Sequence, residues 1–159
     1  MSTELADAGK PCAALDQIFH MQDIMEASGA AEEMPVQHFF APHVYLRQIT
    51  MRAGLLVIGK MHKTEHLNVI IAGDVSIKTP NGIERVTVQK YPCIFVSKPG
   101  VKKVLYCHED TIWATIHPTD TVDMEELERE LVVPESDLRD EQGTLLMSDE
   151  QLQKLLGVE

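Results

Sequence analysis

Two histidines, His62 and His66, stand four residues apart in the segment Gly59–Gly73, directly before an apolar run. Imidazole nitrogens bind metal ions and exchange protons near neutral pH, so this pair carries the clearest chemical signal in the chain. On a helix, residues four apart share a face. In an extended chain, Lys60, His62 and His66 share a face because every second side chain does. Either geometry brings two imidazoles together.

The residues around this pair follow β-strand patterns. Short apolar or alternating runs are separated by turn residues. Pro80-Asn81-Gly82 is the strongest turn signal and predicts a hairpin, whereas Gly73-Asp74 is expected to end a strand. Eight short strands with regular turns predict a mainly β protein with an antiparallel sandwich or barrel. The expected strands are Val44–Met51, Leu55–Ile58, Leu67–Ala72, Val75–Thr79, Glu84–Gln89, Cys93–Val96, Val101–Cys107 and Thr111–Ile116.

Helical patterns flank the strands. Ala13–Ala27 places apolar residues on one helical face, and Val122–Leu131 reads as an amphipathic helix rich in glutamate. A capping box at Ser148–Gln151 predicts a last short helix that ends before Gly157. The expected organisation is one domain in three parts: a helix and linker at 1–42, a barrel at 43–118, and an acidic helical extension at 119–159.

The segment around the two histidines resembles the first motif of the cupin superfamily, which reads G-x5-H-x-H-x3,4-E-x6-G. When the motif is anchored on Gly73, its glutamate falls on His66, its second histidine on His62 and its first histidine on Lys60. The resemblance implies a jelly-roll β-barrel with the functional site inside it.

The second cupin motif, G-x5-P-x-G-x2-H-x3-N, is similar to residues 96–107. Gly100 matches its central glycine, and its histidine falls on Lys103. The chain also looks like small cupin-like proteins of bacteriophages and prophages, which carry a similar His-Lys-Thr-Glu-His-Leu-Asn segment. The resemblance extends from about His38 to Thr119 and implies that the protein is a dimer.

Metal-binding cupins are expected to hold their ion with three histidines and one carboxylate, and this chain departs from that set. Only His62 keeps its residue type, while Lys60 and Lys103 stand where two histidines would be. A protonated lysine is not a metal ligand. A divalent Zn, Fe or Mn ion remains one expectation. Its candidate ligands are His62 and His66, with Glu65 or His117 completing the set.

The same lysines predict a second kind of site, a positive pocket for a carboxylate, phosphate or acidic sugar. Two ammonium groups attract an anion and repel a divalent cation. A third interpretation places the histidines in an ordinary hydrogen-bonded core with the lysines pointing outward. Trp113 alternates in phase with His117, so both are expected to wall the same cavity. The predicted ligand-binding residues are Lys60, His62, Glu65, His66, Lys103, Trp113 and His117.

Charge is unevenly distributed along the 159 residues, whose formal net charge is −11. Residues 43–118 carry +5, residues 1–42 carry −6, and residues 119–159 carry −10. Acidic flanks argue against a nucleic-acid partner. They are expected either to pack against a basic centre, in this subunit or another, or to remain solvated surface.

Neither a bilayer-spanning apolar run nor a basic and apolar leader is present, which predicts a cytoplasmic protein with no membrane partner. A phage-encoded protein would lie in the host cytoplasm or the virion. The three cysteines, Cys12, Cys93 and Cys107, lack a CxxC spacing and are expected to be free thiols.

Three functions remain open. The first is a cupin-like protein that binds a small anionic molecule, with or without catalysis. The second is a metal-dependent isomerase, lyase or oxygenase that uses His62 and His66. The third is an assembly protein whose barrel packs against other phage proteins. A homodimer is expected in each case, because exposed edge strands and the apolar face of the helix at Ala13–Ala27 need a cover.

Overall fold

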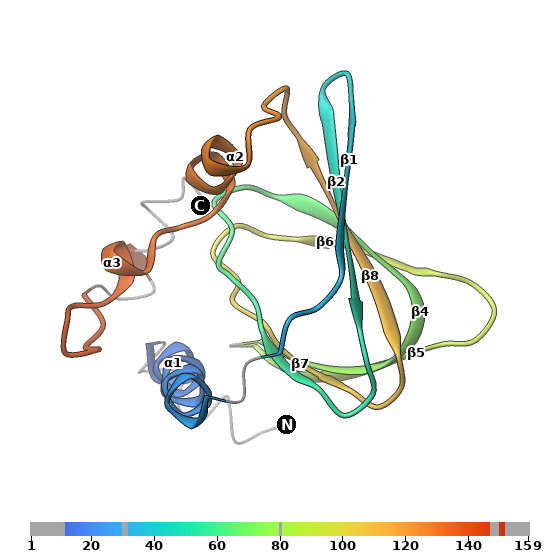
Figure 1. Cartoon of the computed structure of the whole chain (residues 1–159). Helices are drawn as coiled ribbons and strands as arrows, with labels where there is room; N and C mark the ends of the chain where they lie inside the picture. The colour runs from blue at the N-terminus through green and yellow to red at the C-terminus, as the bar shows by residue number, and fades with distance from the viewer. Residues whose placement is uncertain (1–11, 30–31, 80, 147–149, 152–159) are drawn as a thin grey trace.

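The structure is a computed structural model that describes residues 12–29, 32–79, 81–146 and 150–151 (Figure 1). Within these residues, eight strands form a curled antiparallel sheet, one helix precedes it and two short helices follow it. This confirms the predicted fold class. The elements are α1 (Cys12–Ser28), β1 (Val36–Ala41), β2 (Val44–Met51), β3 (Leu56–Ile58), β4 (His66–Thr79), β5 (Gly82–Val88), β6 (Cys93–Ser97), β7 (Val104–Cys107), β8 (Thr111–Pro118), α2 (Met124–Leu131) and α3 (Glu135–Leu138).

The strands run in the order β1-β2-β8-β4-β7-β3, and β5 and β6 also pair with β4. Every pairing is antiparallel. The first half of β4 pairs with β8 and β6, and its second half pairs with β5 and β7. We call β1, β2, β8, β6 and the first half of β4 sheet A, and the remaining strands with the second half of β4 sheet B.

Strand β4 continues where the sequence predicts two strands separated at Gly73-Asp74, so that prediction is wrong. The register with β8 shifts between Ile70 and Ala72, and Gly73 has a φ of 123°. A Cβ atom at Gly73 would collide with Thr111 of β8. Glycine therefore bends the strand from sheet A into sheet B at a close strand crossing.

The sheet also begins earlier than predicted, because β1 pairs with β2 from Val36 opposite Ile49 to Ala41 opposite Val44. The run contains two adjacent aromatic residues, Phe39 and Phe40, which face opposite sides of the sheet and hide the alternation. The predicted bounds of the β2 strand are confirmed at both ends.

The predicted hairpin at Asn81 is confirmed, since it joins β4 to β5 with Thr79 opposite Gly82. The amphipathic helix predicted at Val122–Leu131 is confirmed as α2, whose first turn is capped by the Asp123 carboxylate accepting the Glu126 N–H. The last predicted helix, from Ser148, lies outside the described residues except for Glu150 and Gln151, which are helical.

The apolar core fills only one end of the space inside the curled sheet. A cluster of seven buried residues packs there between sheets A and B: Met51, Ile70, Val75, Ile77, Leu105, Cys107 and Trp113. At the other end, α2 covers the opening with Leu127 and Leu131, which pack against Tyr45. Figure 1 shows α2 beside this opening, with α1 and α3 on the same flank of the molecule. The partly filled interior leaves room for a cavity.

Acidic residues of both flanks contact the basic centre, which agrees with the expectation that the flanks pack against it. Glu128 of α2 pairs with Lys60, Asp120 contacts His43, and Glu32 pairs with Arg52. Cys93 and Cys107 are free thiols. Among the described residues, no helix has the length and apolar character needed to cross a bilayer.

Candidate functional site

Three histidines meet inside the open end of sheet A. His66 begins β4 and His117 lies near the end of β8, both buried on the concave side of the sheet. His62 comes from the loop before β4, where an isolated antiparallel bridge joins it to Val132 after α2. The segment that follows α2 therefore helps to hold the third histidine in place.

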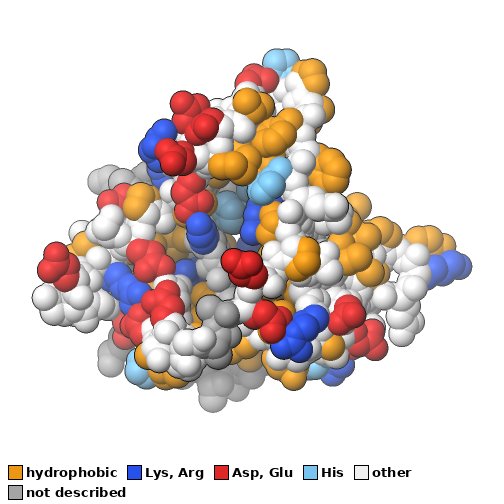
Figure 2. Space-filling model, viewed as in Figure 1, with side chains coloured by type: hydrophobic (Ala, Val, Ile, Leu, Met, Phe, Trp, Pro, Cys, Tyr) orange, Lys and Arg blue, Asp and Glu red, His pale blue; other side chains and the backbone are white. Residues whose placement is uncertain are grey.

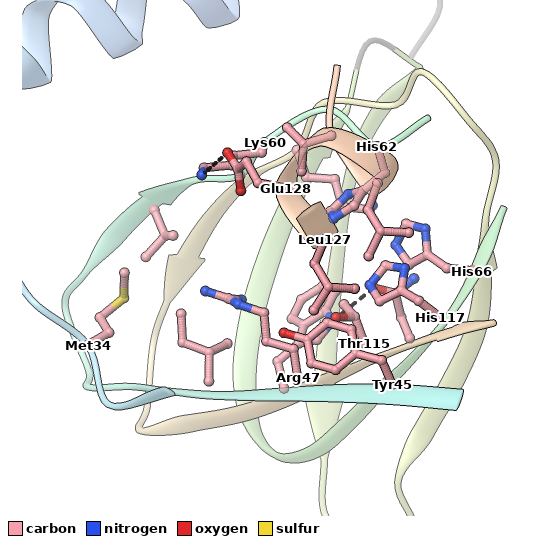
Figure 3. Close-up of a pocket in the computed structure, with 18 of the residues that line it drawn as sticks. Met34, Tyr45, Arg47, Lys60, His62, His66, Thr115, His117, Leu127 and Glu128 are labelled. Carbon is pink, nitrogen blue, oxygen red and sulfur yellow. Dashed lines mark hydrogen bonds and ion pairs between the residues drawn. The ribbon is translucent and has the colours of Figure 1, made fainter. Parts of the chain in front are cut away.

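The three imidazole rings lie against one another at one end of the cavity (Figure 3). Ring centroids are 4.5 Å apart for His62 and His66, 4.6 Å for His66 and His117, and 5.2 Å for His62 and His117. One nitrogen from each ring lies within 4.8 Å of the others. Because Zn–N bonds measure about 2.0–2.1 Å, nitrogens at this separation can converge on one ion with small side-chain movements.

The hydrogen bonding of the rings leaves nitrogens without a partner. His66 Nδ1 lies 3.0 Å from the Thr64 carbonyl oxygen, so this nitrogen carries the proton and Nε2 keeps its lone pair. His66 Nε2, His62 Nδ1 and His117 Nδ1 are buried and have no hydrogen-bond partner within the described part of the chain. A buried polar atom without a partner costs about 1–3 kcal/mol, so three in contact point to a bound group.

The three imidazoles are neutral at physiological pH. Burial, reinforced by the other two histidines and by nearby cations, lowers the pKa of His62 to about 3. Burial, with a smaller effect of His66 and Arg47, lowers the pKa of His117 to about 4. Burial also lowers the pKa of His66. Neutral imidazole is the form that binds a metal, so the protein holds these ligands ready at neutral pH.

Tyr45 of β2 supports the histidines from below. Its ring stacks on His117 with centroids 5.9 Å apart, and its hydroxyl lies 2.7 Å from His38 Nδ1. Phe40 also stacks on the Tyr45 ring, with ring centroids 5.0 Å apart. Burial raises the pKa of the Tyr45 hydroxyl, which therefore remains protonated. This stack limits the movement of His117.

Two cations reach the same cavity. Arg47, on the inner face of β2, and Lys103, just before β7, both line it. Both lower the pKa of His62 by their charge, so both lie near the imidazoles. Burial lowers the pKa of Lys103 to about 8. No carboxylate among the described residues forms an ion pair with either cation.

The cavity has a volume of about 390 Å³. Its end away from the histidines is apolar, and Figure 3 shows Met34 there with the Arg47 side chain between Met34 and the imidazoles. Figure 2 shows histidine and basic side chains inside a hollow, with acidic side chains of α2 on its rim. The apolar walls include Ile49, Met51, Val57, Leu105 and Trp113.

Most of the residues predicted from the sequence are brought together here. His62, His66, Lys103, Trp113 and His117 line the cavity. Lys60 also lines it, but at the mouth, where 64% of its side chain is exposed and its ammonium pairs with Glu128.

Glu65 is the exception. Its carboxylate lies 3.2 Å from Lys98 Nζ on the surface, and the residue does not line the cavity. The side chain alternates out of phase with His66 and so faces away. Glu65 therefore lies outside the cavity, whereas His117 lies beside His62 and His66.

Sequence reasoning missed Arg47 and Asn68 as site residues. Asn68 Nδ2 donates to Ser97 Oγ at 2.8 Å, and its Oδ1 accepts from Trp113 Nε1 at 3.0 Å, so a buried polar chain forms one wall. Asn68 alternates in phase with His66, so extending the strand parity from that histidine would have found it. Arg47 alternates in phase with Ile49 and Met51, but no histidine of the predicted site lies on that strand to identify its inner face.

Known structures share this fold at low sequence identity. A salicylate 1,2-dioxygenase from Pseudaminobacter salicylatoxidans, solved with gentisate, matches with a TM-score of 0.50 and 12% identity over 74% of this chain and 34% of the dioxygenase. A cupin-2 domain protein from Shewanella frigidimarina matches with a TM-score of 0.44 and 12% identity, over 59% of this chain and 89% of that protein. A cupin domain from Bordetella pertussis matches with a TM-score of 0.42 and 15% identity, over 55% of this chain and 92% of that domain.

No protein-family model and no curated protein matches the sequence. The likeness to phage proteins, the cytoplasmic location and the homodimer stay predictions. These similarities concern the fold alone. The described strands, from Val36 to Pro118, form a curled antiparallel sheet that is similar to part of the salicylate 1,2-dioxygenase.

Proposed function

We propose that the protein binds one divalent transition metal ion through His62, His66 and His117 and presents it to a small ligand in the adjoining cavity. One observation supports this proposal most strongly. Three neutral imidazoles converge, and each has a buried nitrogen that has no partner among the described residues. Zn, Fe and Mn are the candidate ions, and imidazole suits Zn and Fe best of these.

The residues fit a metal in two further ways. His66 donates its Nδ1–H to a backbone carbonyl, which fixes the tautomer and orients the ring, as is usual for metal-bound histidine. Three protein ligands also leave a coordination position open for water or a substrate, as in catalytic rather than structural sites. A metal bound here would act as a Lewis acid or, for iron or manganese, as a redox centre.

An enzyme of the isomerase, lyase or oxygenase type is the catalytic form of this proposal. This chain's residues would each have a separate role in it. The histidines hold the ion, Tyr45 limits the movement of His117, and the packing of α2 over the opening reduces the access of water. The fold of a salicylate 1,2-dioxygenase is compatible with the oxygenase form.

A second candidate is a protein that binds an anion without a metal. It is favoured by Arg47 and Lys103, whose positive charges oppose a divalent cation and attract an anion. The two candidates differ in one measurable property, the stoichiometry of bound metal.

The test is elemental analysis of tag-free protein purified without a nickel column, followed by chelator treatment and titration with Zn²⁺, Fe²⁺ and Mn²⁺. We expect one equivalent of metal per chain and competition among the three ions for one site. If the stripped protein binds none of the three ions, the metal proposal is wrong and metal-free anion binding replaces it.

A further inference from the structure

Arg47 differs from the other arginines that lie in or beside the sheet. Arg52 pairs with Glu32 at 2.7 Å, and Arg85 pairs with Asp74 at 2.8 Å, although more than half of each side chain is exposed. Arg47 is more buried than either and has no ion pair within the described residues. A guanidinium that is partly desolvated and unpaired is costly, so its placement inside a cavity calls for a partner from outside the chain.

Two adjacent lysines, Lys102 and Lys103, show the same contrast between a cation with partners and a cation without them. Lys102 is buried, donates to the Gly59 carbonyl oxygen at 3.0 Å and lies 4.9 Å above the Phe19 ring, so its ammonium is accommodated by the fold. Lys103 lines the cavity, and its backbone carbonyl accepts from the Gly59 N–H at 2.9 Å, but its ammonium makes no hydrogen bond or ion pair among the described residues. The fold thus leaves two cations, Arg47 and Lys103, facing one space.

The walls beyond these cations are apolar. Ile49 follows Arg47 on the inner face of β2, and Val57, Leu105 and Trp113 close the same end of the cavity. A volume of about 390 Å³ lies at the lower end of the range of about 300–1,000 Å³ for small-molecule pockets. The cavity therefore has room for a compact ligand with one polar end and one apolar body.

We propose that the ligand is a small carboxylate with a compact apolar body, whose carboxylate is bound by Arg47 with Lys103 as the second cation. A guanidinium matches the two oxygens of a carboxylate in a bidentate pair. This inference rests on the proposed function only in placing the ligand beside the three histidines, and the carboxylate site is measurable without a metal. An anion here would also offset the repulsion between the cations and a bound metal ion.

The test uses benzoate and its neutral isostere benzamide, with inorganic phosphate as an anion that lacks an apolar body. Trp113 is the sole tryptophan of the chain and lines the cavity, so its fluorescence reports binding. We expect benzoate to bind at least about tenfold more tightly than benzamide, because a hydrogen-bonded charge pair contributes about 1.5–3 kcal/mol. Phosphate should bind more weakly than benzoate.

Arg47→Gln should reduce the preference for benzoate to the part that Lys103 alone supports, and Arg52→Gln is the matched control because it removes the same charge from a residue just beyond β2 and outside the cavity. Equal binding of benzoate and benzamide by the wild type, or a preference in Arg47→Gln as large as that of the wild type, would overturn the carboxylate site. The preference is measured on stripped and on metal-loaded protein. A preference without metal binding leaves the carboxylate site standing and removes the metal proposal, and metal binding without a preference does the reverse.

A second inference comes from the convex face of sheet A, where one row of side chains is apolar across all five strands. This row reads Phe39, Leu46, Ile116, Leu67 and Val96. The neighbouring row is apolar on β8, β4 and β6, with Ala114, Val69 and Ile94, and polar on β1 and β2, with Gln37 and Gln48. Phe39, Leu67, Ile94 and Val96 are between 43% and 66% exposed, and no charged residue occupies these two rows.

We infer that this convex face binds the same face of a second copy of the chain. Phe39, Leu67, Ile94 and Val96 are exposed and adjoin one another through Leu46 and Ile116, and adjoining exposed apolar side chains of this kind mark interaction sites. In a chain of net charge −11, an uncharged face can meet its own copy without repulsion. The symmetry of a two-fold dimer requires such a self-complementary surface.

The mass in solution tests this interface. Light scattering should give twice the 17.8 kDa of one chain at micromolar concentration. Ile94→Lys, in the face, should give a monomer. Ile83→Lys is the control, because Ile83 is similarly exposed at 69% but lies on β5, outside sheet A. A monomeric wild type, or dissociation by Ile83→Lys and not by Ile94→Lys, would overturn the interface.

Discussion

At its open end, sheet A reverses the pattern of most antiparallel sheets. Such sheets usually bury an apolar face and expose a polar one. Here one row across the concave face reads His38, Arg47, Thr115, Asn68 and Phe95, and the adjacent row on the convex face reads Phe39, Leu46, Ile116, Leu67 and Val96. The polar row lines a cavity, and the apolar row faces outward.

This reversal separates stability from function within one sheet. The concave face carries titratable and hydrogen-bonding groups at its open end, and the apolar core lies at the other end, where Met51, Ile70 and Trp113 of sheet A pack against sheet B. Residues that break a local folding rule without a local gain are expected at functional sites. This contrast between the faces supports the proposed ligand site on the concave face.

The largest effect that the comparison predicts is the loss of metal binding when a concave-face histidine is removed. His117→Ala should weaken Zn²⁺ binding by at least about a hundredfold, because two imidazoles cannot complete the site. The measurement is competition with a colorimetric chelator.

His108→Ala is the matched control for that experiment. His108 lies in the turn between β7 and β8, where its Nε2 is 2.7 Å from Ser76 Oγ, at the opposite ends of β4 and β8 from His66 and His117. Zn²⁺ affinity should stay at the wild-type value in this variant. A matching loss in both variants would mean that the concave histidines do not hold the ion.

The next effect concerns stability and contrasts the faces directly. Asn68→Ala on the concave face leaves the buried Trp113 N–H and Ser97 hydroxyl without their shared partner. The free energy of unfolding should fall by about 2–6 kcal/mol, at about 1–3 kcal/mol for each of the two unpaired buried groups. Urea denaturation measures it.

Leu67→Ser, on the next residue of the same strand, provides the comparison for Asn68→Ala. Leu67 is 43% exposed on the convex face. In the monomeric Ile94→Lys background, Leu67→Ser should therefore change the protein's free energy of unfolding by less than about 1 kcal/mol. A larger loss from Leu67→Ser than from Asn68→Ala would show that the convex face, and not the concave one, determines the stability of the sheet.

A smaller effect is the pH dependence of carboxylate binding. Burial lowers the pKa of Lys103 to about 8, and Lys103 binds an anion only when protonated. Benzoate affinity should therefore be complete below pH 8 and decrease, by up to about tenfold, as the pH rises above it. A bound anion raises the pKa of Lys103, so the decrease in benzoate affinity occurs at a somewhat higher pH.

The control is Lys103→Gln, in which the benzoate affinity should be lower and independent of pH over the same range, since Arg47 stays charged. A wild-type affinity that does not change between pH 7 and pH 10 would contradict a role for Lys103.

Strand alternation made the fold predictable, and the bounds of β2 and the phase of Trp113 with His117 follow from period two alone. The same alternation puts Arg47 on one face with Ile49 and Asn68 on one face with His66. Both residues were overlooked because neither belongs to a motif. Two features needed coordinates. The passage of β4 through Gly73 depends on its contact with Thr111, and the position of His62 depends on a bridge to Val132, about seventy residues further along the chain. Contacts between distant segments leave no local pattern, so sequence reasoning placed a strand end at Gly73 and left Glu65 and His117 as alternatives.

The smallest predicted effect is that of Lys60, which lies at the mouth of the cavity. The sequence motif places Lys60 beside the histidines, but the structure pairs its ammonium with Glu128 of α2 in a largely exposed position. Exposed ion pairs contribute about 0–1 kcal/mol, so Lys60→Ala should lower the free energy of unfolding by less than about 1 kcal/mol. It should weaken benzoate binding by no more than about threefold, since a screened charge at the mouth acts at a distance. Thermal unfolding and Trp113 fluorescence measure the two quantities. A loss of benzoate affinity as large as that in Arg47→Gln would move the anion site from the concave face to the mouth, and the contrast between the faces would then no longer explain the cavity.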